Sequence, residues 1–82
     1  MERNTIIEKV NEFLINEIEI EPALLTPNAL LNKDLGIDSL DVVDIIVIIE
    51  QVFGIKMKGE EMKNIKMLGE FYDFIEQKIK NN

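Results

Sequence analysis

An all-α fold with a long loop between its first two helices is predicted by three features of the sequence. Apolar residues recur at helical spacing in three long segments. Pro22 and Pro27 lie between the first two segments and interrupt any continuous helix there. The β-branched run from Val42 to Ile49 continues to Phe53, which is too long for a buried strand, and its polar residues have helical spacing.

The first helix is expected to begin at Thr5, because Thr5 and Glu8 have the spacing of a capping box. It is expected to end near residues 16–18. Its apolar face consists of Ile6, Ile7, Val10, Phe13 and Leu14. The loop that follows, over residues 19–38, has too many apolar residues for a free linker, so we expect it to pack on the core. These residues are Leu24, Leu25, Leu30, Leu31, Leu35 and Ile37.

The second helix is expected from Ser39 to Phe53, with a turn at Gly36 before it and a stop at Gly54 after it. A short third helix is expected over residues 60–64. A last amphipathic helix follows, with Lys78 and Lys80 near its C-terminus, where positive charge is favourable. Its apolar positions are Leu68, Phe71, Tyr72, Ile75 and Ile79.

Composition limits the possible functions. A chain of 82 residues with 46% apolar content predicts one folded domain over residues 1–82, able to bury roughly 60% of its surface without disulfides. The net charge of −7 argues against nucleic acid or anionic membrane as partner and favours basic patches on other proteins. The first residues do not resemble a signal peptide, and the longest apolar run, Ile45 to Ile49, is too short to cross a bilayer. We therefore expect a cytoplasmic protein without membrane insertion.

The second helix has two apolar faces when its residues are placed at about 100° intervals. The first is expected to face the core and contains Val42, Ile45, Ile46, Ile49, Val52 and Phe53. The second contains Leu40, Val43 and Val47, flanked by Ser39, Asp44, Glu50 and Gln51. Either the long loop covers this second face, or it is an exposed strip bordered by acids, which is typical of a protein-docking surface and is the interpretation we favour. Ile48 falls among the acids and is expected to be exposed.

Ser39 is the only serine of the chain and lies between Asp38 and Asp41. The chain has no histidine or cysteine, so Ser39 lacks an evident base, which argues against a hydrolase. Ser39 or Asp38 could cap the helix. A phosphate ester on Ser39 would lie at a helix N-terminus, which favours an anion. Together with Asn32 and Asp34 the acids suggest a calcium loop, but the glycine is in the wrong register, so we expect no permanent metal site.

The segment DLGIDSLDVVDIIVIIEQVFGI resembles the modification region of acyl carrier proteins, whose Asp-Ser-Leu motif carries 4′-phosphopantetheine on the serine. The resemblance extends to the Phe53-Gly54-Ile55 turn, the Glu60-Glu61 pair, Ile65 and the ending LGEFYDFI, and so covers nearly the whole chain. It implies a small four-helix bundle of three main helices and one short helix. It also implies a monomer without catalytic activity of its own.

The resemblance implies that a holo-acyl-carrier-protein synthase transfers the phosphopantetheine arm from coenzyme A to Ser39, with Asp38 helping to position the magnesium of the synthase. The thiol of the arm would carry acyl groups as thioesters to acyl-transferring or condensing enzymes of fatty-acid, polyketide or related lipid biosynthesis. The positions that partner enzymes contact would be Leu40, Asp41, Val43, Asp44, Val47, Glu50 and Gln51. The positions that line an acyl cavity would be Ile45, Ile49, Ile65 and Leu68.

The chain departs from the pattern of the family in three places. Lys56-Met57-Lys58-Gly59 replaces an apolar residue, proline and acids; Lys66 and Met67 replace the serine or threonine that often starts the last helix; and Val42 and Ile48 are bulkier than expected. These departures argue against the housekeeping fatty-acid carrier and leave room for a dedicated carrier in polyketide, lipid-tailoring or D-alanyl transfer pathways. Within the carrier class, a D-alanyl or other specialised carrier is therefore the alternative interpretation. Outside the carrier class, the alternative is an unmodified acidic helical interaction domain in which Ser39 only caps its helix.

Overall fold

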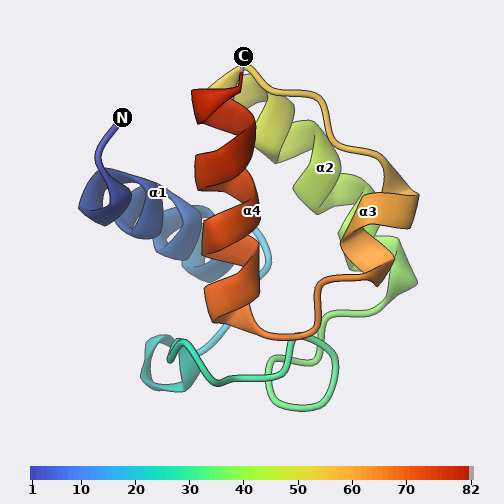
Figure 1. Cartoon of the computed structure of the whole chain (residues 1–82). Coiled ribbons are helices and arrows are strands. Elements are labelled where there is room, and N and C mark those ends of the chain that lie inside the picture. The colour runs from blue at the N-terminus through green and yellow to red at the C-terminus, as the bar shows by residue number, and fades with distance from the viewer. Residues whose placement is uncertain (82) are drawn as a thin grey trace.

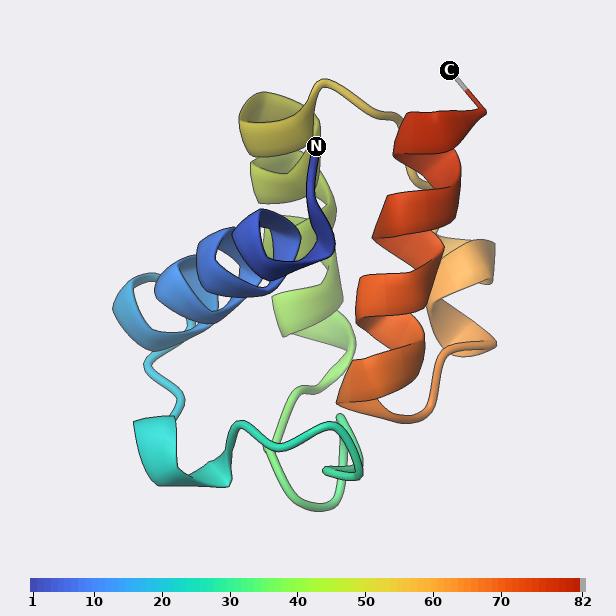
Figure 2. The same cartoon turned by 60° about the vertical axis from the view of Figure 1, so that its left-hand side comes forward.

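The computed structural model describes residues 1–81, and the order of helices in this part confirms the predicted all-α fold. The elements are α1 (Arg3–Asn16), the 3-10 helix η1 (Pro22–Leu24), α2 (Ser39–Phe53), α3 (Gly59–Lys63) and α4 (Leu68–Lys80). The short helix α3 packs against α2, and α1 crosses and packs against α4 (Figures 1 and 2). The loop between α1 and α2 runs across the end of the bundle where α2 and α4 begin. Within residues 1–81, none of the helices has the length and apolar character that crossing a bilayer requires.

The start of α1 differs from the prediction. The helix begins at Arg3, with Glu2 at the N-cap position and without a side-chain hydrogen bond to the cap. Thr5 is therefore already inside the first turn, where it cannot cap, and the predicted capping box of Thr5 and Glu8 is wrong. The guanidinium of Arg3 instead pairs across to α4, at 2.7 Å from an Asp73 carboxylate oxygen.

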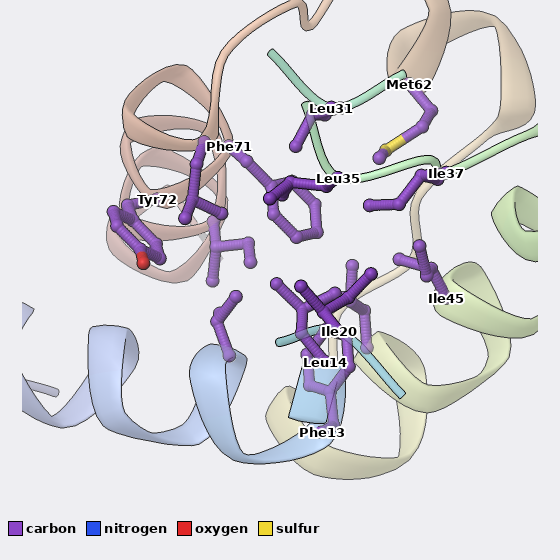
Figure 3. Close-up of a cluster of buried hydrophobic side chains, with 14 of the residues drawn as sticks. Phe13, Leu14, Ile20, Leu31, Leu35, Ile37, Ile45, Met62, Phe71 and Tyr72 are labelled. Carbon is purple, nitrogen blue, oxygen red and sulfur yellow. The ribbon is translucent and has the colours of Figure 1, made fainter. Parts of the chain in front are cut away.

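The hydrophobic core receives side chains from all four α-helices and from the long loop. Figure 3 shows side chains from these elements pointing into one cluster. The largest completely buried side chains are Ile6, Val10, Leu14, Ile45, Ile49, Leu68, Phe71 and Ile75. From the loop, Leu31, Leu35 and Ile37 are buried, as predicted, whereas Leu24 is 44% exposed and does not join the core.

Backbone hydrogen bonds fix the long loop to the start of α4. Gly69 N donates to Pro27 O, and Leu68 N donates to Ala29 O, both at 2.9 Å. A Cβ atom at position 69 would lie 3.1 Å from Pro27 O, so glycine permits this close approach. These hydrogen bonds hold the loop at the start of α4, and from there the chain continues into α2.

The turns around α2 and the start of α4 have clear local causes. Gly36 and Gly54 both have φ of +69°, which confirms the predicted turn and the predicted stop. At the start of α4, the Glu70 carboxylate accepts hydrogen bonds from Lys66 N (2.8 Å) and Met67 N (3.1 Å), the two residues before the helix. These two backbone hydrogen bonds lower the pKa of Glu70 below its ordinary value.

Candidate functional site

Ser39 is the first residue of α2, and Asp38 caps the helix in its place. Asp38 Oδ1 accepts hydrogen bonds from Leu40 N and Asp41 N, each at 3.0 Å. In return, Asp38 N donates to Asp41 Oδ2 at 3.2 Å, which completes a capping box. The interpretation that Ser39 only caps its helix is therefore wrong, because Asp38 has that role.

The chain around Ser39 is anchored on one side and exposed on the other. Ile37 is buried, and its N–H donates to Leu31 O at 2.9 Å. Asp38 and Ser39 follow immediately and are exposed. The buried Ile37 and the capping box together hold the Ser39 hydroxyl at the surface on a rigid helix terminus.

The surroundings of Ser39 offer attachment chemistry rather than activation. Among the hydrogen bonds of residues 1–81, none involves the Ser39 hydroxyl, and one oxygen of each flanking carboxylate, Asp38 Oδ1 and Asp41 Oδ2, is used in the capping box. A phosphate on Ser39 would lie beside the N–H groups of Leu40 and Asp41 and not on them, because Asp38 already accepts both. The site therefore presents a hydroxyl that a separate enzyme could modify.

A groove of about 950 Å³ opens beside Ser39, between α2, α3 and the loop before α2. Its apolar lining includes Leu31, Ile37, Val42, Ile46, Met62 and Ile65. Of the four residues predicted for an acyl cavity, only Ile65 lines this groove. The other three, Ile45, Ile49 and Leu68, are 0% exposed and lie in the core, and their contact with an acyl chain remains a prediction.

The second apolar face of α2 is exposed. Leu40 is 78% exposed, Val43 61% and Val47 49%, so the loop does not cover them and the predicted exposed strip is confirmed. We call these three residues the α2 strip. Of the polar positions expected around it, Asp44, Glu50 and Gln51 are exposed and Asp41 is half-buried. The part of these residues in partner binding remains a prediction.

Two assignments on α2 were wrong. Val52, expected in the core, is 40% exposed in the last turn of the helix. Ile48, expected to be exposed, is half-buried and packs against the core. Both residues border a small hollow lined also by Phe13 and Asn16, where the C-terminal half of α1 lies beside α2. The buried face of α2 is therefore rotated toward α1 relative to the sequence expectation.

Three lysines at the groove were not identified from the sequence. Lys33 comes from the loop before α2, Lys63 from the last position of α3, and Lys66 from the segment before α4, and all three line the groove together with Ser39. They are far apart in the sequence, so no local pattern indicates that they share one site. The sequence patterns draw attention to the positive charges of Lys56 and Lys58 and of Lys78 and Lys80, and none of these four lines the groove.

Comparisons with known proteins agree with this geometry. The family described as the phosphopantetheine attachment site matches residues 8–75. An acyl carrier protein of Thermosynechococcus vestitus is 33% identical over 79 residues, which cover 96% of this chain and 98% of that protein. An acyl carrier protein of Coprothermobacter proteolyticus is 34% identical over 79 residues and 96% of each chain. The crystal structure of an acyl carrier protein from Thermotoga maritima superposes with a TM-score of 0.82 at 26% identity, covering 99% of this chain and 94% of that one.

Proposed function

The chain belongs to the acyl carrier protein family, and from this premise we propose that Ser39 is the residue that carries its 4′-phosphopantetheine arm. A holo-acyl-carrier-protein synthase transfers the arm from coenzyme A to the Ser39 hydroxyl. The terminal thiol of the arm then holds acyl groups as thioesters, which supplies the thiol chemistry that a chain without cysteine lacks.

The observation that carries this proposal is that the Ser39 hydroxyl is exposed beside the groove and does not cap α2. Asp38 stabilises the start of α2, so a phosphodiester on Ser39 replaces no hydrogen bond of the fold. Asp38 Oδ1 accepts hydrogen bonds from two backbone N–H groups of α2. In addition to this structural role, we assign Asp38 a role in positioning the magnesium of the synthase, as the family resemblance implies.

The groove is the first contact for an acyl group on the arm. Ile65, Met62 and Ile46 give it an apolar wall beside Ser39. A longer acyl chain would continue between the helices toward Ile45, Ile49 and Leu68, displacing contacts of the core. The groove therefore gives the predicted cavity an entrance.

Partner enzymes dock on the α2 strip and on the polar residues around it in this proposal. The strip is apolar and exposed, and Asp44 and Glu50 give its surroundings negative charge that attracts basic enzyme surfaces. The protein acts as a cytoplasmic monomer of one domain, without catalytic activity, and presents its cargo to fatty-acid, polyketide or related lipid biosynthetic enzymes, including those of specialised pathways.

Intact mass spectrometry after incubation with coenzyme A and a phosphopantetheinyl transferase tests the attachment site. We expect the wild-type chain to gain the mass of one arm and Ser39→Ala to gain none. Thr26→Ala, which removes an exposed hydroxyl from the long loop, is the matched control and should gain the arm. Circular dichroism should show that both variants are folded, since Asp38 keeps the cap of α2.

Two results would contradict the proposal. Modification of the Ser39→Ala variant would place the arm elsewhere. A wild-type chain that stays unmodified with an active transferase and a control carrier protein would favour an unmodified acidic interaction domain.

A further inference from the structure

The groove beside Ser39 is positively charged, although the chain as a whole is acidic. The charged residues that line it are three lysines, Lys33, Lys63 and Lys66, and one acid, Asp38. The whole chain, in contrast, has 9 basic and 16 acidic residues. The excess of lysine at the groove reverses the sign of the surface at the place where cargo would lie.

These lysines are available to a ligand. All three are exposed, and the ion pairs found within residues 1–81 use Arg3 and Lys78 instead. The carboxylate of Asp38, the one acid of the lining, accepts the backbone N–H groups of α2.

The backbone around the lysines is fixed by hydrogen bonds and helix packing, so the three side chains start from defined places around one groove. Lys66 O accepts a hydrogen bond from Leu31 N at 2.9 Å, and Lys66 N donates to Glu70 at 2.8 Å. The loop and the segment before α4 are therefore tied together at the groove. Lys63 closes the third side from α3, which packs against α2.

We propose that this groove binds acyl groups that end in a carboxylate, with the apolar wall holding the carbon chain and Lys33, Lys63 and Lys66 pairing with the terminal anion. The inference rests on the proposed function, because the acyl group reaches the groove on the arm of Ser39. An acyl group that ends in a methyl would contact the apolar wall, but the ammonium groups of the lysines would remain hydrated. The phosphodiester of the arm has a fixed place at Ser39 itself, at the start of α2, whereas the lysines come from three segments around the groove.

A matched pair of cargoes tests the proposal. The arm is loaded with hexanoyl or adipoyl groups through an amide in place of the thioester, so that the cargo stays attached. The two groups have equal length and differ in a terminal methyl or carboxylate. Intact mass first verifies that the arm is present; a chain that gains no arm contradicts the proposed function at this step, before the lysines are tested.

The measurement is the pKa of the terminal carboxyl of the adipoyl group, followed by ¹³C NMR on the carrier and on the free arm. The net charge of −7 by itself raises the pKa of an attached carboxyl, so a lower pKa requires nearby cations. We expect the pKa on the carrier to be lower than on the free arm by about 0.2 to 0.7 for each contacting lysine, as for an exposed ion pair.

Charge-matched variants identify the cations. Lys63→Gln combined with Lys66→Gln should reduce the lowering to the part that Lys33 causes, whereas Lys9→Gln combined with Lys80→Gln should keep it in full, although both pairs change the net charge equally. Lys9 and Lys80 are exposed and lie outside the groove lining. Amide shifts of groove residues should also differ between the adipoyl and hexanoyl forms.

Three outcomes would overturn the proposal. The pKa on the carrier could equal or exceed that on the free arm. The two pairs of lysine variants could have the same effect, which would mean that the interaction is not local. Finally, the groove variants could change the ³¹P shift of the unacylated arm without changing the carboxyl pKa, which would assign the lysines to the phosphodiester.

Discussion

The substitutions Ile49→Ala and Val47→Ala test whether the two apolar faces of α2 have different functions. Ile49 is completely buried, whereas Val47 is 49% exposed, although the two residues are separated by one position in the same helix. Ile49→Ala removes three carbons from the core, a transfer loss of about 2.4 kcal/mol at about 0.8 kcal/mol per carbon. The cavity left behind increases the loss, so we expect about 2–5 kcal/mol in total.

Val47→Ala removes two carbons that are already half in water. The transfer loss is therefore about 0.8 kcal/mol, and the higher helix propensity of alanine offsets up to about 0.6 kcal/mol of it. The expected net change in the free energy of unfolding is below about 0.5 kcal/mol. A domain of this size has a total of roughly 4–12 kcal/mol, so Ile49→Ala removes a large fraction and Val47→Ala almost none.

Urea unfolding followed by far-UV circular dichroism measures both changes, with the m-value as a check that the unfolded states are comparable. Arm transfer by a phosphopantetheinyl transferase then separates folding from docking. Val47→Asp lacks the helix propensity of alanine and lies three residues from both Asp44 and Glu50, so it should be less stable than Val47→Ala by about 1 kcal/mol, which is still less than Ile49→Ala loses. It should lower kcat/KM roughly fivefold or more, the effect of losing about 1 kcal/mol at an interface. Ile49→Ala should keep kcat/KM at temperatures where it is folded.

Either of two results would contradict a difference in function between the two faces of α2. Equal destabilisation by Ile49→Ala and Val47→Ala would show that the α2 strip is covered in solution. An unchanged kcat/KM for Val47→Asp would show that the transferase does not contact the strip.

Three further substitutions have expected outcomes. Asp44→Lys should slow association with the transferase and flatten its salt dependence in stopped-flow titrations, because the Debye length falls from about 10 Å at 0.1 M salt to about 3 Å at 1 M. Asp38→Asn keeps a good cap, so its urea midpoint should be unchanged while kcat for arm transfer falls if Asp38 helps position magnesium. The pKa of Glu70 is lowered from its ordinary value of 4.5, so the ionised carboxylate stabilises the fold at a pH above 4.5. This stabilisation is lost as the pH falls through the pKa of Glu70 in the folded state. Urea midpoints should therefore show that Glu70→Gln loses less stability than wild type on acidification.

The helices were predictable because their cause is local. Apolar spacing and the two glycines with positive φ determine where α2 begins and ends, and these signals lie within the segment itself. The start of α1 was missed because the helix begins at Arg3 without a side-chain cap, so no capping residue in the sequence indicates it. Ile48 was misplaced because α1 packs beside it.

The site divides in the same way. The exposure of the α2 strip could be predicted because its three residues belong to one helix, and a helical projection places their side chains. The residues around the groove come from a loop, a short helix and a connecting segment, so the convergence of Lys33, Lys63 and Lys66 depends on the tertiary fold. One contact that brings these segments together is the hydrogen bond from Leu31 N to Lys66 O. No spacing in the sequence indicates this hydrogen bond.

The two charged surfaces meet at Ser39, and their opposite signs restrict how a partner can approach. Val43 belongs both to the α2 strip and to the groove lining, so the acidic and the basic regions are adjacent. A basic enzyme surface attracted to Asp44 would be repelled by Lys63 if it covered the groove, because like charges oppose a wrong orientation. Docking from the side of the strip avoids this repulsion and leaves the groove uncovered. The arm on Ser39 would then be able to move its cargo from the groove to the enzyme without separation of the two proteins.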